Sequence, residues 1–391
     1  MVFDKLKIMY IPRSIEPRLK KALAQFPSCV ITGPRQSGKS TLLKHFIPQY
    51  TYVTFDNPLM RKLAKEDPEL FLNTNPEPLI LDEIQYAPEL LSYLKLKIDQ
   101  KRDLPGRFVL TGSQTFNLMK GVTESLAGRI AVFNLYPLSW HEIKKEPNPS
   151  EMALQTIRGF YPELFAHSHF DWNEWYGSYL STYIERDVRN IKAITDLSRF
   201  QTFISLLAPR AGQLLNLTEV AKECGISQPT AKDWLSLLEA TYVVKILRPY
   251  HVNRTKIMTK TPKLFFVDTG LLCYLLGIDS ENRFFRAGEK GHIFENMVIM
   301  EKLKRLASES EYFQAYFYRT QSGEEIDLLI EKGNHLEAFE IKLTQTLSRD
   351  LAATLKEFSK EYAPARASLL TLQENRVALH PGIWAEPWFA I

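Results

Sequence analysis

The chain has 391 residues, more than one typical hydrophobic core accommodates, so we expect two or three domains. It is 45% hydrophobic and 24% charged, which indicates an ordinary folded, soluble protein and argues against a disordered chain. The formal net charge of +4 is compatible with a nucleic-acid partner but is not evidence for one.

The cysteines and the apolar segments of the sequence predict where in the cell the protein is located. Cys29, Cys224 and Cys273 lie far apart and form no CxxC pair, so the sequence suggests neither a zinc site nor a disulfide framework. The N-terminus lacks the apolar core of a signal peptide, and the longest apolar stretch, residues 270–278, is too short to span a bilayer. We therefore expect a cytoplasmic protein without a membrane partner.

The pattern along the chain predicts three domains. After a helical lead-in, residues 28–145 alternate short apolar strands with polar helices, which predicts βαβ units and a parallel sheet. A polar segment with two prolines, residues 144–151, predicts a boundary. The next part is mainly helical, and the last part mixes strands and helices. The expected domains are 1–150, 151–260 and 261–391.

The first chemical motif is a phosphate-binding loop. The segment ITGPRQSGKST fits G-x-x-x-x-G-K-[ST] and lies between an apolar strand and a helix, a context that disfavours a chance match in a surface loop. Lys39 would reach the β- and γ-phosphates and Ser40 would bind Mg²⁺, so the expected cofactors are ATP and Mg²⁺. The expected nucleotide contacts are Gly33, Pro34, Arg35, Gln36, Ser37, Gly38, Lys39, Ser40 and Thr41.

Hydrolysis also needs an acid on the metal side and a group that orients water. Asp82 and Glu83 end the apolar segment PLILDE, so Asp82 would hold Mg²⁺ and Glu83 would orient the attacking water; the alternative is an ordinary helix start. Ser113, with Gln114 beside it, ends the next strand and is a candidate γ-phosphate sensor, unless it only forms a turn. Arg129 is a candidate charge-stabilising arginine, although most arginines are merely solvated or salt-bridged.

These segments carry a family resemblance. GPRQSGKST, LILDEIQ, LTGS and LAGR…YPLSWHE resemble a prokaryotic branch of AAA-type ATPases, in which the ATPase domain precedes an uncharacterised C-terminal region. Further shared segments are GFYPELF (159–165), YLSTYIERDV (179–188), VDTGLL (267–272) and RTQSGEEIDLLI (319–330). The resemblance covers most of the chain and implies ATPase activity.

Two details of this resemblance are open. The family usually has two small residues before Tyr-Pro, whereas this chain has Gly159 followed by Phe160. In the shared IERD motif, Arg186 either contacts phosphate or pairs with Glu185 or Asp187 in its helix.

The middle of the chain has the rhythm of a winged helix-turn-helix. Within residues 216–247, we expect Thr218 to cap a helix, Gly225 to form the turn and Ser227 to cap a second helix. Ala221 is the small residue that would let the helices approach, and Pro229 follows in the first turn. The core-facing residues would be Trp234, Leu237 and Leu238. The segment TYVVKILRPY would then form a wing strand.

A basic run follows this motif. Between Glu239 and Asp268 there is no acidic residue but six basic ones, Lys245, Arg248, Arg254, Lys256, Lys260 and Lys263, with Tyr242, Tyr250 and His251 among them. A basic wing beside a recognition-like helix favours DNA or RNA as a partner through the stretch 245–263. The alternatives are a solvated loop and a module that binds a protein.

The C-terminal part predicts a hairpin with charged residues on one face. If Gly333-Asn334 forms the turn, Asp327 lies opposite Glu340 and Glu325 opposite Lys342. Opposed carboxylates repel each other unless a positive group lies between them, and a divalent metal is the simplest occupant. The other face would carry Ile326, Leu328, Phe339 and Ile341. A Glu325–Lys342 salt bridge without metal is the alternative.

Asp327 followed by Glu340-x-Lys342 resembles the PD-(D/E)xK nuclease superfamily, in which an upstream helix often adds a Glu, here Glu295. The resemblance implies an α/β nuclease-like domain with Glu295, Asp327 and Glu340 on a metal, Lys342 in catalysis, and phosphodiester hydrolysis.

The sequence as a whole predicts an ATPase that couples nucleotide state to nucleic-acid binding or to metal-dependent cleavage. The main alternative is a regulatory switch ATPase whose C-terminal domains bind a protein partner. A homo-oligomeric ring that remodels its target is a further alternative.

Overall fold

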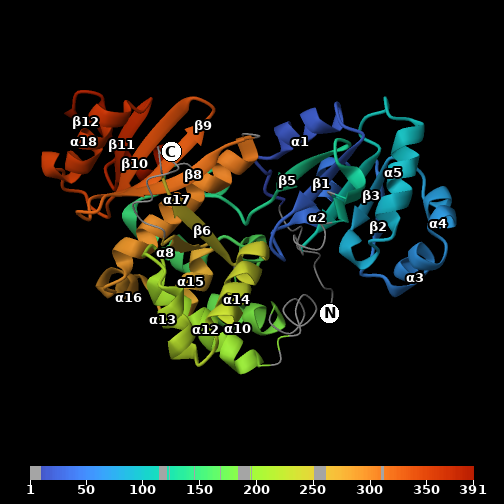
Figure 1. Ribbon diagram of the computed structural model, residues 1–391, viewed down its shortest axis with the longest axis horizontal. Coiled ribbons are helices and arrows are strands. Elements are labelled where there is room, and N and C mark those ends of the chain that lie inside the picture. The colour runs from blue at the N-terminus through green and yellow to red at the C-terminus, as the bar shows by residue number, and fades with distance from the viewer. Residues whose placement is uncertain are drawn as a thin grey trace.

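The computed structural model describes residues 10–113, 121–122, 124–144, 146–167, 169–183, 194, 196–250, 261–309 and 312–391. Figure 1 shows three lobes: an N-terminal lobe built on one sheet, a C-terminal lobe built on another, and a helical lobe between and below them.

The N-terminal lobe is a parallel sheet of five strands in the order β2-β3-β4-β1-β5. The strands are β1 (Ser28–Thr32), β2 (Thr51–Thr54), β3 (Leu79–Asp82), β4 (Phe108–Gly112) and β5 (Ile130–Asn134). The helices are α1 (Glu16–Leu23), α2 (Lys39–Phe46), α3 (Pro58–Glu66), α4 (Pro68–Thr74), α5 (Leu90–Gln100) and α7 (Trp140–Ile143). Strands β1, β3 and β4 are buried throughout because helices cover both faces of the sheet. The predicted parallel sheet is confirmed.

The helical lobe contains the two helices expected of a helix-turn-helix. Its members are α8 (Pro149–Arg158), α9 (Pro162–Ala166), α10 (Trp172–Tyr183), α12 (Leu197–Leu207), α13 (Leu217–Cys224) and α14 (Gln228–Ala240). Gly225 ends α13 with φ +67° and Ser227 caps α14, both as predicted. The expected cap at Thr218 is wrong. Asn216 caps α13 instead, because its side chain accepts the Glu219 N–H at 3.2 Å.

The segment expected to form a wing strand joins a larger sheet. Strand β6 (Val244–Pro249) pairs antiparallel with β7 (Lys263–Phe266) and parallel with β8 (Gln314–Arg319). The sheet has eight strands in the order β12-β13-β11-β10-β9-β8-β6-β7. Its other strands are β9 (Glu325–Lys332), β10 (His335–Ile341), β11 (Arg366–Thr371), β12 (Val377–His380) and β13 (Ile383–Pro387). The sheet therefore runs across the boundary expected at residue 260.

Helices pack on both faces of this second sheet. One face packs against α17 (Lys290–Glu309), in a core shared with the helical lobe, α15 (Thr269–Leu275) and α16 (Glu281–Arg286). The other face packs against α18 (Ala353–Tyr362). Among the described residues, none of the helices combines the length and apolarity that crossing a membrane requires.

The β9–β10 hairpin has the predicted register. His335 pairs with Lys332 and Phe339 with Leu328, as a turn at Gly333-Asn334 requires. The apolar face differs from the expectation at one residue. Two residues of β9, Asp327 and Leu328, oppose the single β8 residue Phe317 in a β-bulge. As a result, Ile326 packs on the α18 side while Leu328 packs on the α17 side.

Candidate active site

The phosphate-binding loop follows β1 and leads into α2, as predicted. A side chain at Gly33 would collide with the Leu135 carbonyl oxygen, and Gly38 adopts φ +91° at the start of α2, so both positions need glycine. Lys39 is only 5% exposed, and its ammonium donates to the carbonyl oxygens of Gly33 at 3.0 Å and Pro34 at 2.8 Å. The lysine lies folded against its own loop.

Asp82, at the end of β3, accepts three hydroxyl groups. The Ser40 hydroxyl lies 3.0 Å from both carboxylate oxygens, and Tyr52 and Thr111 also donate to Asp82. Burial, followed by the hydrogen bond to Asp82, raises the pKa of Tyr52, so Tyr52 stays a donor at neutral pH. The predicted pair of Ser40 and Asp82 is therefore adjacent, and its hydroxyl and carboxylate oxygens are the ligands that Mg²⁺ prefers.

Glu83 has an unusual backbone that fixes its position. It is in the left-handed region at φ 59° and ψ 45°, a conformation that costs a non-glycine residue about 1 kcal/mol or more. The Glu83 N–H donates to the Thr111 hydroxyl at 3.1 Å. The Glu83 carboxylate accepts Gln85 and, at 3.3 Å, the Ser113 hydroxyl. Ser113 therefore lies beside the residue expected to orient water, while Gln114 is outside the described residues.

Arg129 does not belong to this pocket. It directly precedes β5 at Ile130, which pairs with Ser28 at the first residue of β1, whereas the phosphate-binding loop follows the last residue of β1. Its guanidinium pairs with Asp99 at 2.7 and 2.9 Å. The prediction that Arg129 stabilises charge at the nucleotide is wrong within one chain, because the residue lies at the ends of the strands opposite to the phosphate-binding loop.

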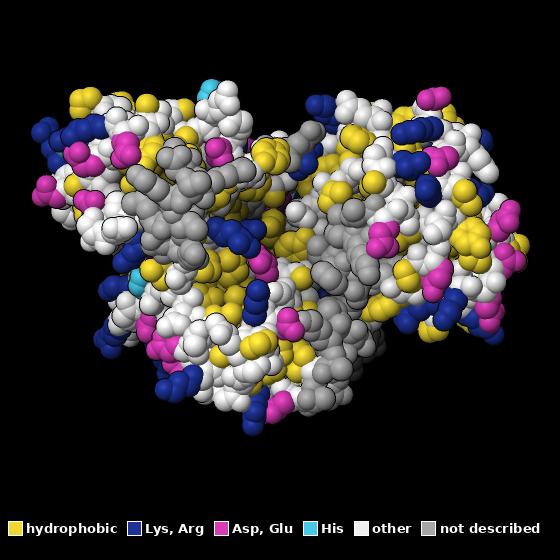
Figure 2. All heavy atoms as spheres, in the orientation of Figure 1, with side chains coloured by type: hydrophobic (Ala, Val, Ile, Leu, Met, Phe, Trp, Pro, Cys, Tyr) yellow, Lys and Arg dark blue, Asp and Glu magenta, His cyan; other side chains and the backbone are white. Residues whose placement is uncertain are grey.

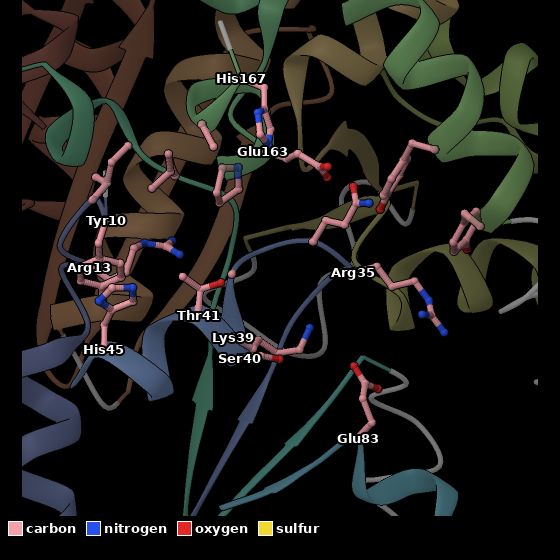
Figure 3. A pocket seen from close by; sticks show the side chains of 18 of the residues that line it. Tyr10, Arg13, Arg35, Lys39, Ser40, Thr41, His45, Glu83, Glu163 and His167 are labelled. Atoms are coloured by element: carbon pink, nitrogen blue, oxygen red, sulfur yellow. The ribbon is translucent and has the colours of Figure 1, made fainter. Parts of the chain in front are cut away.

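The helical lobe forms part of the nucleotide pocket. The cavity has a volume of about 640 Å³ and is lined by the phosphate-binding loop together with Pro162 and Glu163 of α9 and Tyr179 and Tyr183 of α10. In Figure 3, Glu163 and His167 lie across the pocket from Lys39, Ser40 and Glu83. Sequence reasoning gave the segment GFYPELF no role, although it lies directly over the loop.

Two aromatic rings at the pocket were also missed. Tyr10 and His45 line the cavity and stack with ring centroids 4.4 Å apart. Nothing in the local sequence signals this pair, because the two rings come from different segments of the chain.

A buried arginine that also lines the cavity (Figure 3) supports the phosphate-binding loop. Arg13 donates to the carbonyl oxygens of Ser37 at 2.8 Å and Tyr136 at 2.7 Å, and its guanidinium pairs with Glu142 at 3.1 Å. Burial alone would raise the pKa of Glu142, but the Arg13 charge and the N–H groups of Ser14 and Ser139 lower it overall. Arg13 therefore joins the phosphate-binding loop to the segment that follows β5.

A tyrosine of the helical lobe contacts the strand that leads into the loop. The Tyr242 hydroxyl lies 2.9 Å from the Thr32 hydroxyl and donates to the Asn134 side-chain oxygen at 2.7 Å. Tyr242 lies two residues before the start of β6, so these bonds connect the end of β1 to the segment that leads into β6. The nucleotide loop and the second sheet are thus joined by a short polar path.

The segments around residues 160 and 268 are joined by hydrogen bonds. Asp268 accepts the Phe160 N–H at 2.8 Å and the Tyr176 hydroxyl, and any side chain at Gly159 would collide with these groups. Phe160 itself is fully buried. These shared residues therefore join α8 and α9 to α15. Glu185, Arg186 and Asp187 of the IERD motif lie outside the described residues.

Part of the basic stretch lines a groove between the lobes. Lys245, Arg248 and Arg18 contribute to a cavity of about 520 Å³, together with Tyr136, Tyr312, Phe313 and Tyr316. Figure 2 shows the surface hollowed between the N-terminal and C-terminal lobes. Lys245 and Arg248 form no ion pair with any residue that the structure describes. Arg254, Lys256, Lys260 and His251 lie outside the described residues.

Lys263, the last member of that basic stretch, is not on the surface. It is 2% exposed, and its ammonium lies 2.9 Å from Glu295, pairs with Glu325 and lies 3.8 Å from Asp327. The expectation that Lys263 contacts nucleic acid is therefore wrong, because the residue is buried within the C-terminal carboxylates.

The predicted C-terminal residues do converge. Glu295 comes from α17 and Asp327 from β9, while the Lys342 ammonium lies 2.6 Å from Glu340 and 3.9 Å from Asp327. Burial and then the charges of Glu295 and Glu340 raise the pKa of Asp327 well above its usual range. The alternative Glu325–Lys342 bridge does not form, because Glu325 pairs with Lys263 and Arg319.

These residues do not fit a metal ion as they stand. Within the described ranges, no group of three or more Asp, Glu, His or Cys residues has an arrangement that would hold one. The Lys263 ammonium lies among the carboxylates that a metal would need.

Family models match three successive parts of the chain. A family model described as an AAA domain matches residues 25–144, and two domains of unknown function, DUF8612 and DUF4143, match residues 151–282 and 290–390. The Walker-type ATPase of Pyrococcus abyssi is similar over 70% of this chain and 96% of its own, with 16% identity and a TM-score of 0.42.

Full-length relatives are uncharacterised. A protein of Methanocaldococcus jannaschii is 24% identical over 84% of this chain and 78% of its own. Proteins of Mycobacterium tuberculosis and Mycobacterium bovis are each 32% identical over 96% of this chain and 83% of their own length. With its AAA-type P-loop ATPase domain, the chain belongs to the family of these mycobacterial proteins.

Proposed function

We propose that the chain binds and hydrolyses ATP with Mg²⁺ and uses the nucleotide state to control nucleic-acid binding by its C-terminal half. Lys39 would exchange its two backbone carbonyl partners for phosphate oxygens, which attract an ammonium more strongly because they are charged. A bound Mg²⁺ would be held by Ser40 and Asp82 and would supply positive charge beside the phosphates. Glu83, fixed by Thr111, would orient the attacking water.

One observation carries the coupling. Asn134, the last residue of β5, and Tyr136, two residues further on, line the same groove as Lys245 and Arg248. Asn134 also accepts the Tyr242 hydroxyl, and the Tyr136 carbonyl accepts Arg13, which holds the phosphate-binding loop. A shift of the loop on nucleotide binding would therefore reach the groove wall through Tyr242 and Arg13.

The chemistry of the groove suits a single-stranded nucleic acid. Cationic side chains attract the phosphates, and aromatic rings offer surfaces on which bases stack. Lys245, Arg248, Tyr312 and Tyr316 bring both kinds of side chain to the groove, where Glu239 is the one acidic residue among its described lining. Helix α14, the second helix of the proposed winged helix, contributes Glu239 to the groove.

The test is binding of a labelled single-stranded or double-stranded oligonucleotide, measured by fluorescence anisotropy with and without ATP. Affinity should change with nucleotide and fall steeply between about 50 and 200 mM salt. Arg248→Glu should weaken binding, whereas Lys360→Glu, which alters an exposed lysine on α18 paired with Glu357, should not. Binding that is absent or insensitive to salt would favour the alternative, a regulatory switch ATPase with a protein partner.

A further inference from the structure

The C-terminal carboxylates are neutralised by a lysine that their sequence motif does not contain. Lys263 begins β7 at the sheet edge, far along the chain from Asp327, Glu340 and Lys342. Its ammonium nevertheless contacts Glu295, Glu325 and Asp327, and it is more deeply buried than Lys342. Burial opposes the charge on Lys263, but the nearby carboxylates outweigh it and raise its pKa, so the residue stays a cation.

One carboxylate of the cluster has an oxygen whose hydrogen-bonding capacity is not used within the described part of the chain. Glu340 is 8% exposed, and its Oε2 is buried without a hydrogen-bond partner among the described residues. Asp327 lies between the two ammonium groups, 3.8 Å from Lys263 and 3.9 Å from Lys342. A divalent ion bound to Asp327 and Glu295 would have to lie next to the Lys263 ammonium, and like charges at that distance repel strongly in a buried site.

We propose that Lys263 takes the place of the divalent cation in this cluster, so that the C-terminal domain binds no metal there and does not cleave phosphodiesters. The side chain of Lys263 supplies the positive charge that the opposed carboxylates need. It also fastens the edge strand β7 to β9 and α17. The domain is then a binding and structural unit, and this conclusion does not depend on whether the chain hydrolyses ATP.

The proposal is tested by thermal unfolding without nucleotide, in the presence and absence of Mn²⁺. A metal that binds only the folded state raises the unfolding temperature. The wild type and Asp327→Asn should show the same small response, because neither holds metal in the cluster. Lys263→Ala leaves the carboxylates without their cation, so it should unfold at lower temperature and recover on addition of Mn²⁺. The double variant Lys263→Ala with Asp327→Asn should lose that recovery.

Matched controls separate this effect from general loss of stability. Lys302→Ala removes another buried lysine of α17, which pairs with Glu337 of β10 at 3.2 Å. This variant should show no gain in the Mn²⁺ response. If Lys263→Ala does not fold, the comparison of wild type with Asp327→Asn still decides. A Mn²⁺ response of the wild type that disappears in Asp327→Asn would overturn the proposal. So would a folded Lys263→Ala variant that gains no response.

Discussion

Lys39, at the start of α2, and Lys263, at the start of β7, both carry buried ammonium groups, yet their partners differ. Lys39 donates to two neutral carbonyl oxygens of its own loop. Lys263 is enclosed by the carboxylates of Glu295, Glu325 and Asp327. A phosphate competes well with carbonyl oxygens but poorly with several carboxylates, because the carboxylates already balance the lysine charge.

The difference extends to the surroundings of each lysine. Lys39 opens onto a cavity of about 640 Å³ that accommodates a ligand. Lys263 instead satisfies groups that would otherwise repel one another. The comparison teaches that the residues of a motif do not alone decide whether its site can bind a ligand. A side chain from elsewhere in the chain, such as Lys263, can occupy the site.

The largest expected effect is the loss of ATP hydrolysis when Lys39 is replaced. Lys39→Ala should reduce ATP hydrolysis about 100-fold or more, because it removes the charge that meets the phosphates. Phosphate release measures this loss. Lys62→Ala, which alters an exposed lysine of α3 paired with Glu66, should hydrolyse ATP at the wild-type rate. ATP hydrolysis by Lys39→Ala at the wild-type rate would contradict the claim that Lys39 meets the phosphates.

Glu83→Gln should separate binding from chemistry in the open site. The amide keeps the shape of the side chain and its bond to Ser113 but no longer accepts a proton from water. Hydrolysis should fall about 100-fold, while ATP should still raise the unfolding temperature as in the wild type. Loss of that thermal shift would assign Glu83 to nucleotide binding instead.

A buried ion pair beside the nucleotide loop offers a structural parallel to the Lys263 cluster. Glu142→Gln leaves Arg13 buried without its charged partner and should cost about 3 kcal/mol of unfolding free energy at neutral pH. Because the pKa of Glu142 is lowered in the folded state, the pair stabilises the fold above the unfolded pKa of about 4.3.

That stabilisation is lost as the pH falls through the lowered, folded-state pKa of Glu142. The difference in unfolding free energy between the wild type and Glu142→Gln should therefore shrink in acid. Thermal unfolding between about pH 7 and pH 3 would measure this change. A difference in unfolding free energy that stays constant over this pH range would mean that the ion pair contributes little beyond packing.

The smallest expected effect tests the path between the two regions. Tyr242→Phe removes the hydroxyl that bonds Thr32 and Asn134, a loss of about 1 kcal/mol, and keeps the ring edge against Tyr136. ATP should then alter oligonucleotide affinity less than in the wild type, by about fivefold, as anisotropy titrations would report. Tyr250→Phe, outside this path, serves as the matched control. Equal nucleotide dependence in both variants would break the proposed link.

Local patterns predicted much of the fold. The phosphate-binding loop, the five parallel strands and Gly225 follow from short segments whose neighbours in sequence determine their structure. The hairpin register follows from the Gly333-Asn334 turn, because a two-residue turn fixes which residues face each other. The convergence of Asp327 and Glu340 was predictable for the same reason.

Contacts between distant segments were not predictable in this way. Lys263 reads as one member of a solvated basic run, and nothing near it in sequence reveals that Glu295, Glu325 and Asp327 surround it. The motif that contains Arg129 does not show that this residue lies at the ends of the strands opposite to the phosphate-binding loop. The cover that α9 and α10 provide over the nucleotide depends on how two lobes pack.

The coupling between the lobes is the central claim, and the rate of ATP hydrolysis tests it most directly. Phosphate release would be measured with and without single-stranded and double-stranded nucleic acid, for the wild type and for Arg248→Glu. We predict that nucleic acid changes the wild-type rate, and that Arg248→Glu needs a higher nucleic-acid concentration for the same change. An active enzyme whose rate is the same with and without every nucleic acid would contradict the coupling.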